Sequence, residues 1–137
     1  LLAGLEHLTV LVGAETGINV TARGLVEGKI AGPYLSLFVL GILCNIFIFI
    51  AVNGYANNPH PVGKYLALFL GVSVFILCGT EHSVADMYYW SVSGVLYEQP
   101  GESFLRLAVI SLGNIVGGVF LPLMEKAKAR LDAPSAS

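Results

Sequence analysis

The feature that most constrains this chain is a long apolar run, residues 34–52, that contains no charged side chain. It reads YLSLFVLGILCNIFIFIAV, and its one strongly polar member is Asn45. A helix that crosses the core of a bilayer needs about 20 mostly apolar residues. The run is therefore predicted to be a transmembrane helix.

The composition of the whole chain agrees with a membrane protein. Only 12% of its 137 residues are Asp, Glu, Lys or Arg, against about 25% in a typical soluble domain, and the mean hydropathy is +0.77. The net charge of −2 gives no basic surface, so we expect no nucleic-acid partner. Cys44 and Cys78 lie in apolar runs without the spacing of a metal site, and both are interpreted as buried free thiols.

A second apolar segment, residues 65–96, is too long for one membrane crossing. As a continuous helix it would measure about 48 Å at 1.5 Å per residue, whereas the hydrocarbon core is about 30 Å thick. A loop rich in Asn, Pro and Gly precedes it. We predict a broken helix with its break near residues 80–86, because irregular backbone is tolerated at membrane depth only where it is buried or lines a cavity.

A third span is predicted at residues 105–124, after a turn at Pro100 and Gly101. Its glycines Gly113 and Gly117 have the spacing that lets two helices approach closely in lipid. Residues 1–31 are interpreted as the end of a preceding span followed by an extracytoplasmic surface segment. Residues 125–137 form a tail whose basic cluster EKAKAR adjoins the third span and favours a cytoplasmic C-terminus.

Three ionisable residues, Glu81, His82 and Asp86, gather at the predicted break. On a helix, His82 and Asp86 would share a face at i and i+4. Ionisable groups at membrane depth usually mark a proton relay, an ion path or a substrate site. The alternative is a buried polar network that only fixes the break.

Asn45 and Asn114 each stand alone in the middle of a span. They could join helices by hydrogen bonds, or face the same cavity as His82 and donate to an anion. A haem site would need a second histidine at membrane depth, and Ser83 beside His82 is a poor nucleophile–base pair. We therefore expect no enzyme activity and no cofactor.

Three stretches resemble one family. GTEHSVADMYYW (79–90) is similar to a signature of the formate/nitrite transporter family, FVLGILCN (38–45) resembles its G-I-L-x-N span, and LGNIVGGVF (112–120) resembles its last span. The stretches occur in the family's order and spacing.

The resemblance implies an aquaporin-like helical bundle and a homopentamer in which each protomer has six spans and its own pore. It implies small monovalent anions or their conjugate acids as substrates: formate, nitrite, hydrosulfide or short carboxylates. The implied location is the inner (cytoplasmic) membrane of a prokaryote. Only the second half of a protomer is matched, so the chain is expected to be a partial protomer, and one half alone cannot close a pore.

The resemblance also implies roles for single residues. His82 matches the central pore histidine, which would give a proton to the substrate or relay it. Glu81 matches the acid beside that histidine, and Phe75 matches an apolar constriction of the pore.

The remaining matches lie farther from His82. Asn45 and Asn114 match polar residues near the pore, and Lys29 matches a vestibule lysine that attracts anions. Asp86 stands where the family often has Asn, and Thr80 where it often has Phe. The competing hypothesis is a non-transporting membrane subunit in which these polar groups hold helices together.

Overall fold

The structure, a computed structural model, describes residues 17–132. Within them it contains helices and no strands, which confirms the all-α class for this part of the chain. The helices are α2 (Gly17–Ala31), α3 (Tyr34–Asn57), α4 (Pro61–Leu77), α5 (Ser83–Ser93), α6 (Val95–Glu98) and α7 (Pro100–Leu131). The expected end of a preceding span, in residues 1–16, and the end of the tail, residues 133–137, lie outside the described residues.

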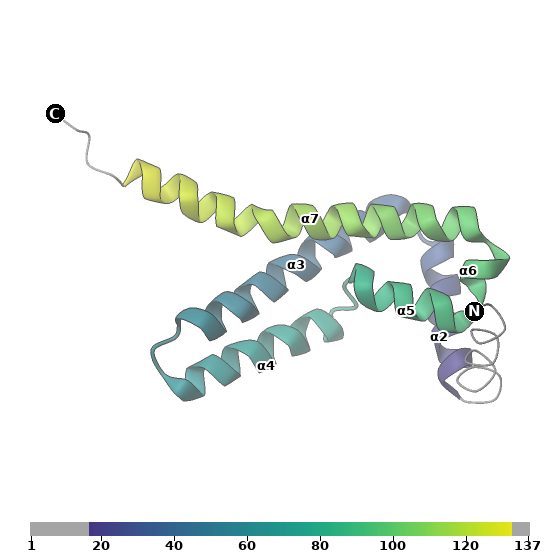
Figure 1. Cartoon of the computed structure of the whole chain (residues 1–137), viewed down its shortest axis with the longest axis horizontal. Helices are drawn as coiled ribbons and strands as arrows, with labels where there is room; N and C mark the ends of the chain where they lie inside the picture. The colour runs from purple at the N-terminus through teal and green to yellow at the C-terminus, as the bar shows by residue number, and fades with distance from the viewer. Residues whose placement is uncertain (1–16, 133–137) are drawn as a thin grey trace, which may run out of the picture.

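Among the described helices, α3 and α7 are long and apolar enough to cross a membrane. With 32 residues, α7 measures about 48 Å at 1.5 Å per residue and is longer than the predicted span 105–124. It begins at Pro100 and continues through the basic cluster to Leu131, so most of the expected tail is helical. Figure 1 shows this end of α7 extending past the other helices.

The crossing of α3 and α7 depends on glycine. A Cβ atom added to Gly41 would lie 2.8 Å from the carbonyl oxygen of Ile110. One added to Gly117 would meet the carbonyl oxygen of Ile42, and one added to Gly113 would meet that of Phe38. The interpretation of Gly113 and Gly117 as a site of close helix approach is therefore confirmed.

The long apolar segment is interrupted, and the interruption covers residues 78–82. Helix α4 ends where Gly79 adopts a left-handed conformation (φ +60°), which only glycine adopts without strain. The Thr80 hydroxyl donates a hydrogen bond of 2.8 Å to the carbonyl oxygen of Phe75 and closes this end. The irregular backbone thus begins before the expected residues 80–86, and Asp86 lies in the first turn of α5 rather than in the break.

Two further differences concern the ends of this segment. Helix α5 stops at Ser93 because Gly94 is also left-handed (φ +78°), and the short α6 follows in place of the expected helix to residue 96. Cys44 is buried as expected, whereas Cys78 is exposed beside the break, so the prediction of a buried thiol is wrong for Cys78.

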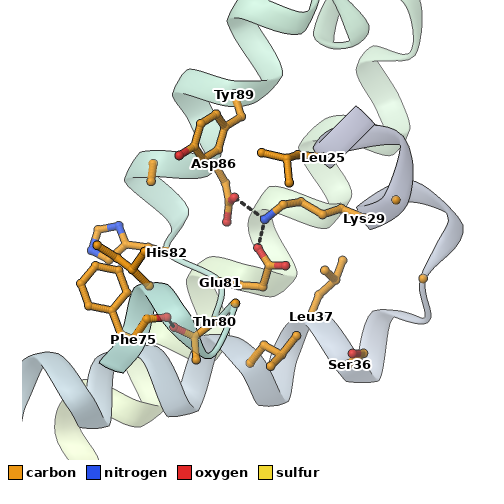
Figure 2. A pocket seen from close by; sticks show the side chains of 16 residues that line it. Leu25, Lys29, Ser36, Leu37, Phe75, Thr80, Glu81, His82, Asp86 and Tyr89 are labelled. Carbon is orange, nitrogen blue, oxygen red and sulfur yellow. Dashed lines mark hydrogen bonds and ion pairs between the residues drawn. The ribbon is translucent and has the colours of Figure 1, made fainter. Parts of the chain in front are cut away.

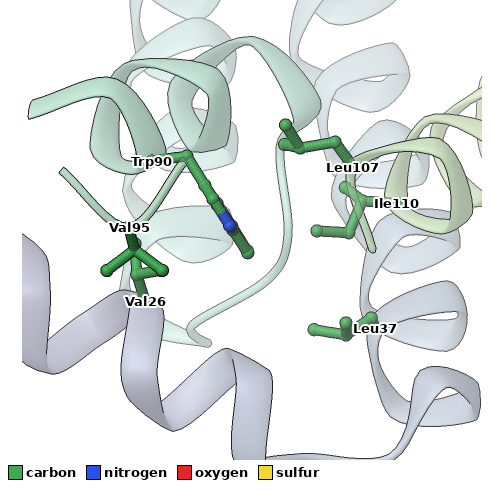
Figure 3. Close-up of a cluster of buried hydrophobic side chains, with 6 residues drawn as sticks. All are labelled: Val26, Leu37, Trp90, Val95, Leu107 and Ile110. Atoms are coloured by element: carbon green, nitrogen blue, oxygen red, sulfur yellow. The ribbon is translucent and has the colours of Figure 1, made fainter. Parts of the chain in front are cut away.

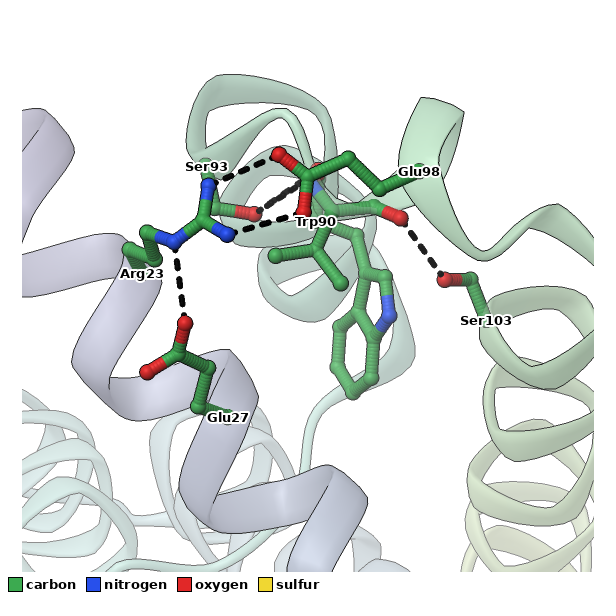
Figure 4. A network of polar contacts seen from close by, with 7 residues as sticks. Arg23, Glu27, Trp90, Ser93, Glu98 and Ser103 are labelled. Carbon is green, nitrogen blue, oxygen red and sulfur yellow. Dashed lines mark hydrogen bonds and ion pairs between the residues drawn. The ribbon is translucent and has the colours of Figure 1, made fainter.

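Residues 17–31, which belong to the expected span end and surface segment of residues 1–31, form α2, which packs against α5. A cluster of buried side chains joins α2, α3, α5, α6 and α7 (Figure 3); its members are Val26, Leu37, Trp90, Val95, Leu107 and Ile110. At the outer edge, Arg23 donates hydrogen bonds of 2.9 and 2.8 Å to the Glu98 carboxylate (Figure 4). These contacts hold α2 beside the C-terminal end of the broken segment.

Helix α4 has no buried residue, although its mean hydropathy is high. Large apolar side chains such as Phe69 (69% exposed) and Leu70 (56% exposed) cover its outer surface. A soluble monomer rarely exposes so much contiguous apolar area. This surface indicates contact with lipid or with another apolar protein surface.

Candidate functional site

The irregular residues 78–82 are held in place by Asn114 of α7. Its side-chain amide nitrogen donates to the carbonyl oxygens of Gly41 (3.0 Å) and Glu81 (2.8 Å). Its side-chain oxygen accepts a bond of 2.9 Å from the backbone N–H of Ser83, the first residue of α5. One buried amide thus joins α3, the break and the start of α5, and satisfies backbone groups that the interruption leaves without helical partners.

Asn45 of α3 makes a related contact. Its amide nitrogen donates a bond of 2.6 Å to the backbone oxygen of Asn114. These contacts are those of helix-joining amides, and they occupy hydrogen-bonding groups that an anion would otherwise use. A direct role for either residue in anion binding stays a prediction.

A buried ionic cluster lies on the other side of the break. The ammonium group of Lys29 on α2 donates a hydrogen bond of 2.7 Å to Asp86 Oδ1 and also contacts the Glu81 carboxylate. The side chains of Lys29, Glu81 and Asp86 are 16%, 7% and 2% exposed. Figure 2 shows the Lys29 ammonium between the two carboxylates.

Arg106 of α7 fixes the end of α2 that carries Lys29. Its guanidinium donates to the carbonyl oxygens of Lys29 (2.6 Å) and Gly32 (2.8 Å) and to Glu102 (2.7 Å). It also lies over the ring of Tyr34, 4.4 Å from the centroid. Arg106 was not among the residues singled out from the sequence. The available signal is that Arg106 is the one charged residue in the predicted span 105–124, because a charge within a span usually has a partner inside the protein.

The ionic cluster lines a pocket of about 440 Å³ together with Phe75 and His82. The Phe75 and His82 rings lie next to each other at the end of α4, with centroids 6.2 Å apart and ring planes tilted by 35°. Figure 2 shows the two rings side by side, away from the ammonium of Lys29. The pocket is therefore charged at one end and aromatic at the other.

A second pocket, of about 460 Å³, also reaches His82. Asn45, Ser83 and Asn114 line it, with apolar residues of α7. His82 is the ionisable residue that the two pockets share. Within the described part of the chain, nothing hydrogen-bonds the imidazole, so its nitrogens are available to a ligand.

The structure thus brings together all seven residues singled out from the sequence, in two groups. Phe75, Glu81, His82, Asp86 and Lys29 surround the first pocket, and Asn45 and Asn114 line the second beside His82.

One expected relation differs. His82 precedes α5 with extended backbone (φ −113°, ψ 111°). It therefore does not share a helical face with Asp86, which turns toward Lys29.

The site combines an ammonium group, two carboxylates and an imidazole. An imidazole exchanges protons near neutral pH, and an ammonium group attracts anions. Among residues 17–132, no group of three His, Cys, Asp or Glu side chains is arranged to hold a metal ion.

Comparison with known proteins gives a consistent result. The sequence profile of the formate/nitrite transporter family matches residues 1–126. The chain is 27% identical to the formate channel FocA of Haemophilus influenzae in an alignment that covers 80% of this chain and 45% of that protein. It is 32% identical to formate-nitrite transporter 2 of Toxoplasma gondii in an alignment that covers 85% of this chain and 26% of that protein.

The formate channel FocA of Escherichia coli K12 is 25% identical in an alignment that covers 85% of this chain and 47% of the relative. The chain thus spans less than half the length of each of these curated relatives. No solved structure matches it significantly.

Proposed function

The chain belongs to the formate/nitrite transporter family and is an integral membrane protein, and from this premise we propose that it forms part of a path for small monovalent anions or their conjugate acids. Formate, nitrite, hydrosulfide and short carboxylates are the substrates considered. The relatives named as formate channels and formate-nitrite transporters support this class. The observation that carries the proposal is the position of His82 between two pockets, beside Phe75.

The first step in the proposed path is the approach of the anion to the ionic cluster. Transfer of an isolated anion into an apolar pore costs many kcal/mol by Born solvation. The ammonium of Lys29 lowers this cost locally. Because it lies in the pocket of about 440 Å³ that His82 also lines, it can bring an anion into the same pocket as the imidazole.

The second step is neutralisation of the anion. Phe75 narrows the end of the pocket next to His82 and excludes water and free ions. A proton delivered through the His82 imidazole to the substrate oxygen converts the anion to a weak acid, which crosses the apolar constriction at a much lower cost. The imidazole is then protonated again from the second pocket.

We also propose how the pore is completed and where the protein lies. The chain supplies the second half of an aquaporin-like protomer, and an opposing broken helix completes the pore. This is supported by coverage of less than half of each relative. The apolar outer surface of α4 is available to lipid and to neighbouring protomers of a homopentamer. The proposed location is a prokaryotic inner membrane with the basic end of α7 in the cytoplasm.

A second candidate is a non-transporting subunit, and one observation favours it. The side chain of Asn114 and the carboxylates around Lys29 are hydrogen-bonded within the protein, as expected for a network that only stabilises the fold. This candidate predicts a folded protein without flux.

The test is uptake of isotopically labelled formate by proteoliposomes that contain the purified full-length protein. We expect uptake well above that of protein-free liposomes, reduced by competing nitrite. Uptake equal to that of the protein-free control, from protein that is folded by circular dichroism, would favour the structural subunit.

A further inference from the structure

The charges of the buried ionic cluster do not balance. One ammonium, that of Lys29, contacts two carboxylates, those of Glu81 and Asp86. When all three groups are ionised, the cluster carries one net negative charge where little water can screen it. A single proton on one carboxylate makes the cluster neutral.

The hydrogen bonds show which carboxylate can take that proton. Asp86 is 2% exposed, and its Oδ1 accepts the bond from Lys29. Its Oδ2 is buried and has no hydrogen-bond partner among the described residues. An unpaired carboxylate oxygen at such depth is costly, and a proton would turn it into a donor for a ligand in the adjoining pocket (Figure 2).

The second buried cation of this region, Arg106, does not supply the missing positive charge. Arg106 on the neighbouring α7 is engaged by Glu102 and by backbone carbonyls. The titratable or charged groups that face or adjoin Asp86 are Lys29 on α2, Cys44 on α3, Glu81 and His82 in the break, and Tyr89 on α5.

We propose that Asp86 makes anion binding at the Lys29 cluster depend on a proton. With a proton on Oδ2, the cluster is neutral, and the Asp86 O–H and the third N–H of the Lys29 ammonium both donate to a monovalent anion. Without the proton, the net negative charge excludes the anion. The inference rests on the proposed anion path. It adds that the protonation of Asp86 controls whether an anion binds at the Lys29 cluster.

Proton and anion then bind together. The carboxylate of Asp86 takes one proton from solvent, forming an O–H bond, and the pocket takes one anion, so no net charge enters. By linkage, an anion that prefers the protonated cluster raises the population of protonated Asp86. An asparagine here keeps a neutral donor and removes the dependence on the proton.

The direct test is infrared difference spectroscopy on the reconstituted full-length protein with nitrate as the anion. Nitrate has no carboxyl group and does not accept a proton near neutral pH. We expect nitrate to increase the intensity of the carbonyl-stretch band of a protonated carboxylic acid in the wild type and in Asp86→Glu. This increase in intensity should be absent in Asp86→Asn. It should be the same as in the wild type in the control Glu125→Gln, which removes an exposed carboxylate on α7. No rise in the wild type, or an equal rise in Asp86→Asn, overturns the inference.

Formate uptake as a function of pH separates this inference from the proposed function. In the wild type, one linked proton makes uptake fall by up to about tenfold for each pH unit above the transition. Asp86→Asn should show a flatter profile and faster uptake than the wild type at neutral pH. If the wild type does not transport, the proposed function fails, while the infrared signal still decides the role of Asp86. If both proteins transport with the same pH profile, the role of Asp86 is wrong and the anion path stands.

Discussion

Replacement of Asn114 by Leu tests how the break in the long apolar segment is held. Leucine has the same branched arrangement of four side-chain heavy atoms as asparagine but cannot make the three side-chain hydrogen bonds to Gly41, Glu81 and Ser83. The carbonyl oxygen of Gly41 keeps its backbone hydrogen bond within α3, so loss of the bond from Asn114 costs little at this group. The Glu81 carbonyl and the Ser83 N–H lie at the interruption and lose a buried partner.

An unsatisfied buried backbone group costs about 1–3 kcal/mol, and side-chain hydrogen bonds in membrane proteins average about 0.6 kcal/mol. For the two groups at the break together, we expect Asn114→Leu to lower the free energy of unfolding by about 2–4 kcal/mol. The measurement is reversible unfolding in mixed micelles, followed by circular dichroism.

Two variants provide a graded comparison. Asn45→Leu removes one hydrogen bond between α3 and α7 and should cost about 1 kcal/mol. Ser111→Ala removes a bond to Leu107 within the same helix and should cost less than about 1 kcal/mol. The reasoning is refuted if Asn114→Leu is no more destabilising than Ser111→Ala.

Three further predictions concern other contacts. Gly117→Ala should destabilise the protein by about 1–3 kcal/mol because its Cβ meets a carbonyl of α3, whereas Gly118→Ala, which has room, should be tolerated; equal thermal stability of the two variants would contradict this. Phe75→Ala should increase water and proton leakage in stopped-flow assays on proteoliposomes, and an unchanged leak would exclude Phe75 as a constriction. The hydrogen bonds and charge of Arg23 hold the pKa of Glu98 below its ordinary value. The ion pair therefore stabilises the folded protein fully above about pH 4.3, the ordinary pKa of Glu, and this stabilisation is lost as the pH falls through the lowered pKa. The difference in thermal stability between the wild type and Glu98→Gln should therefore disappear at acidic pH. A difference that does not change with pH would contradict a stabilising role for this ion pair.

The helices were largely predictable because their signals are local. The absence of charge in residues 34–52 locates α3, and the spacing of Gly113 and Gly117 indicates where α7 is crossed. The need for a break followed from the length of residues 65–96, which would measure about 48 Å as one helix at 1.5 Å per residue. Its position was less predictable, because Gly79 ends the helix before the polar residues that drew attention to it.

The contacts of the site were less predictable because they join distant parts of the chain. Lys29 and Asp86 are 57 residues apart, and Asn114 and Glu81 are 33 apart. Helical spacing paired Asp86 with His82, but that spacing holds only within a helix, and His82 lies just before α5. The side chains therefore diverge toward different partners.

The most direct test of the anion path is formate uptake by proteoliposomes that contain the His82→Phe variant. The same exchange at exposed His60, His60→Phe, serves as the control. If His82 delivers the proton between the two pockets, His82→Phe loses most of the uptake and changes its pH dependence, while His60→Phe behaves as the wild type. Uptake by His82→Phe at the wild-type rate and with the wild-type pH dependence would contradict the account.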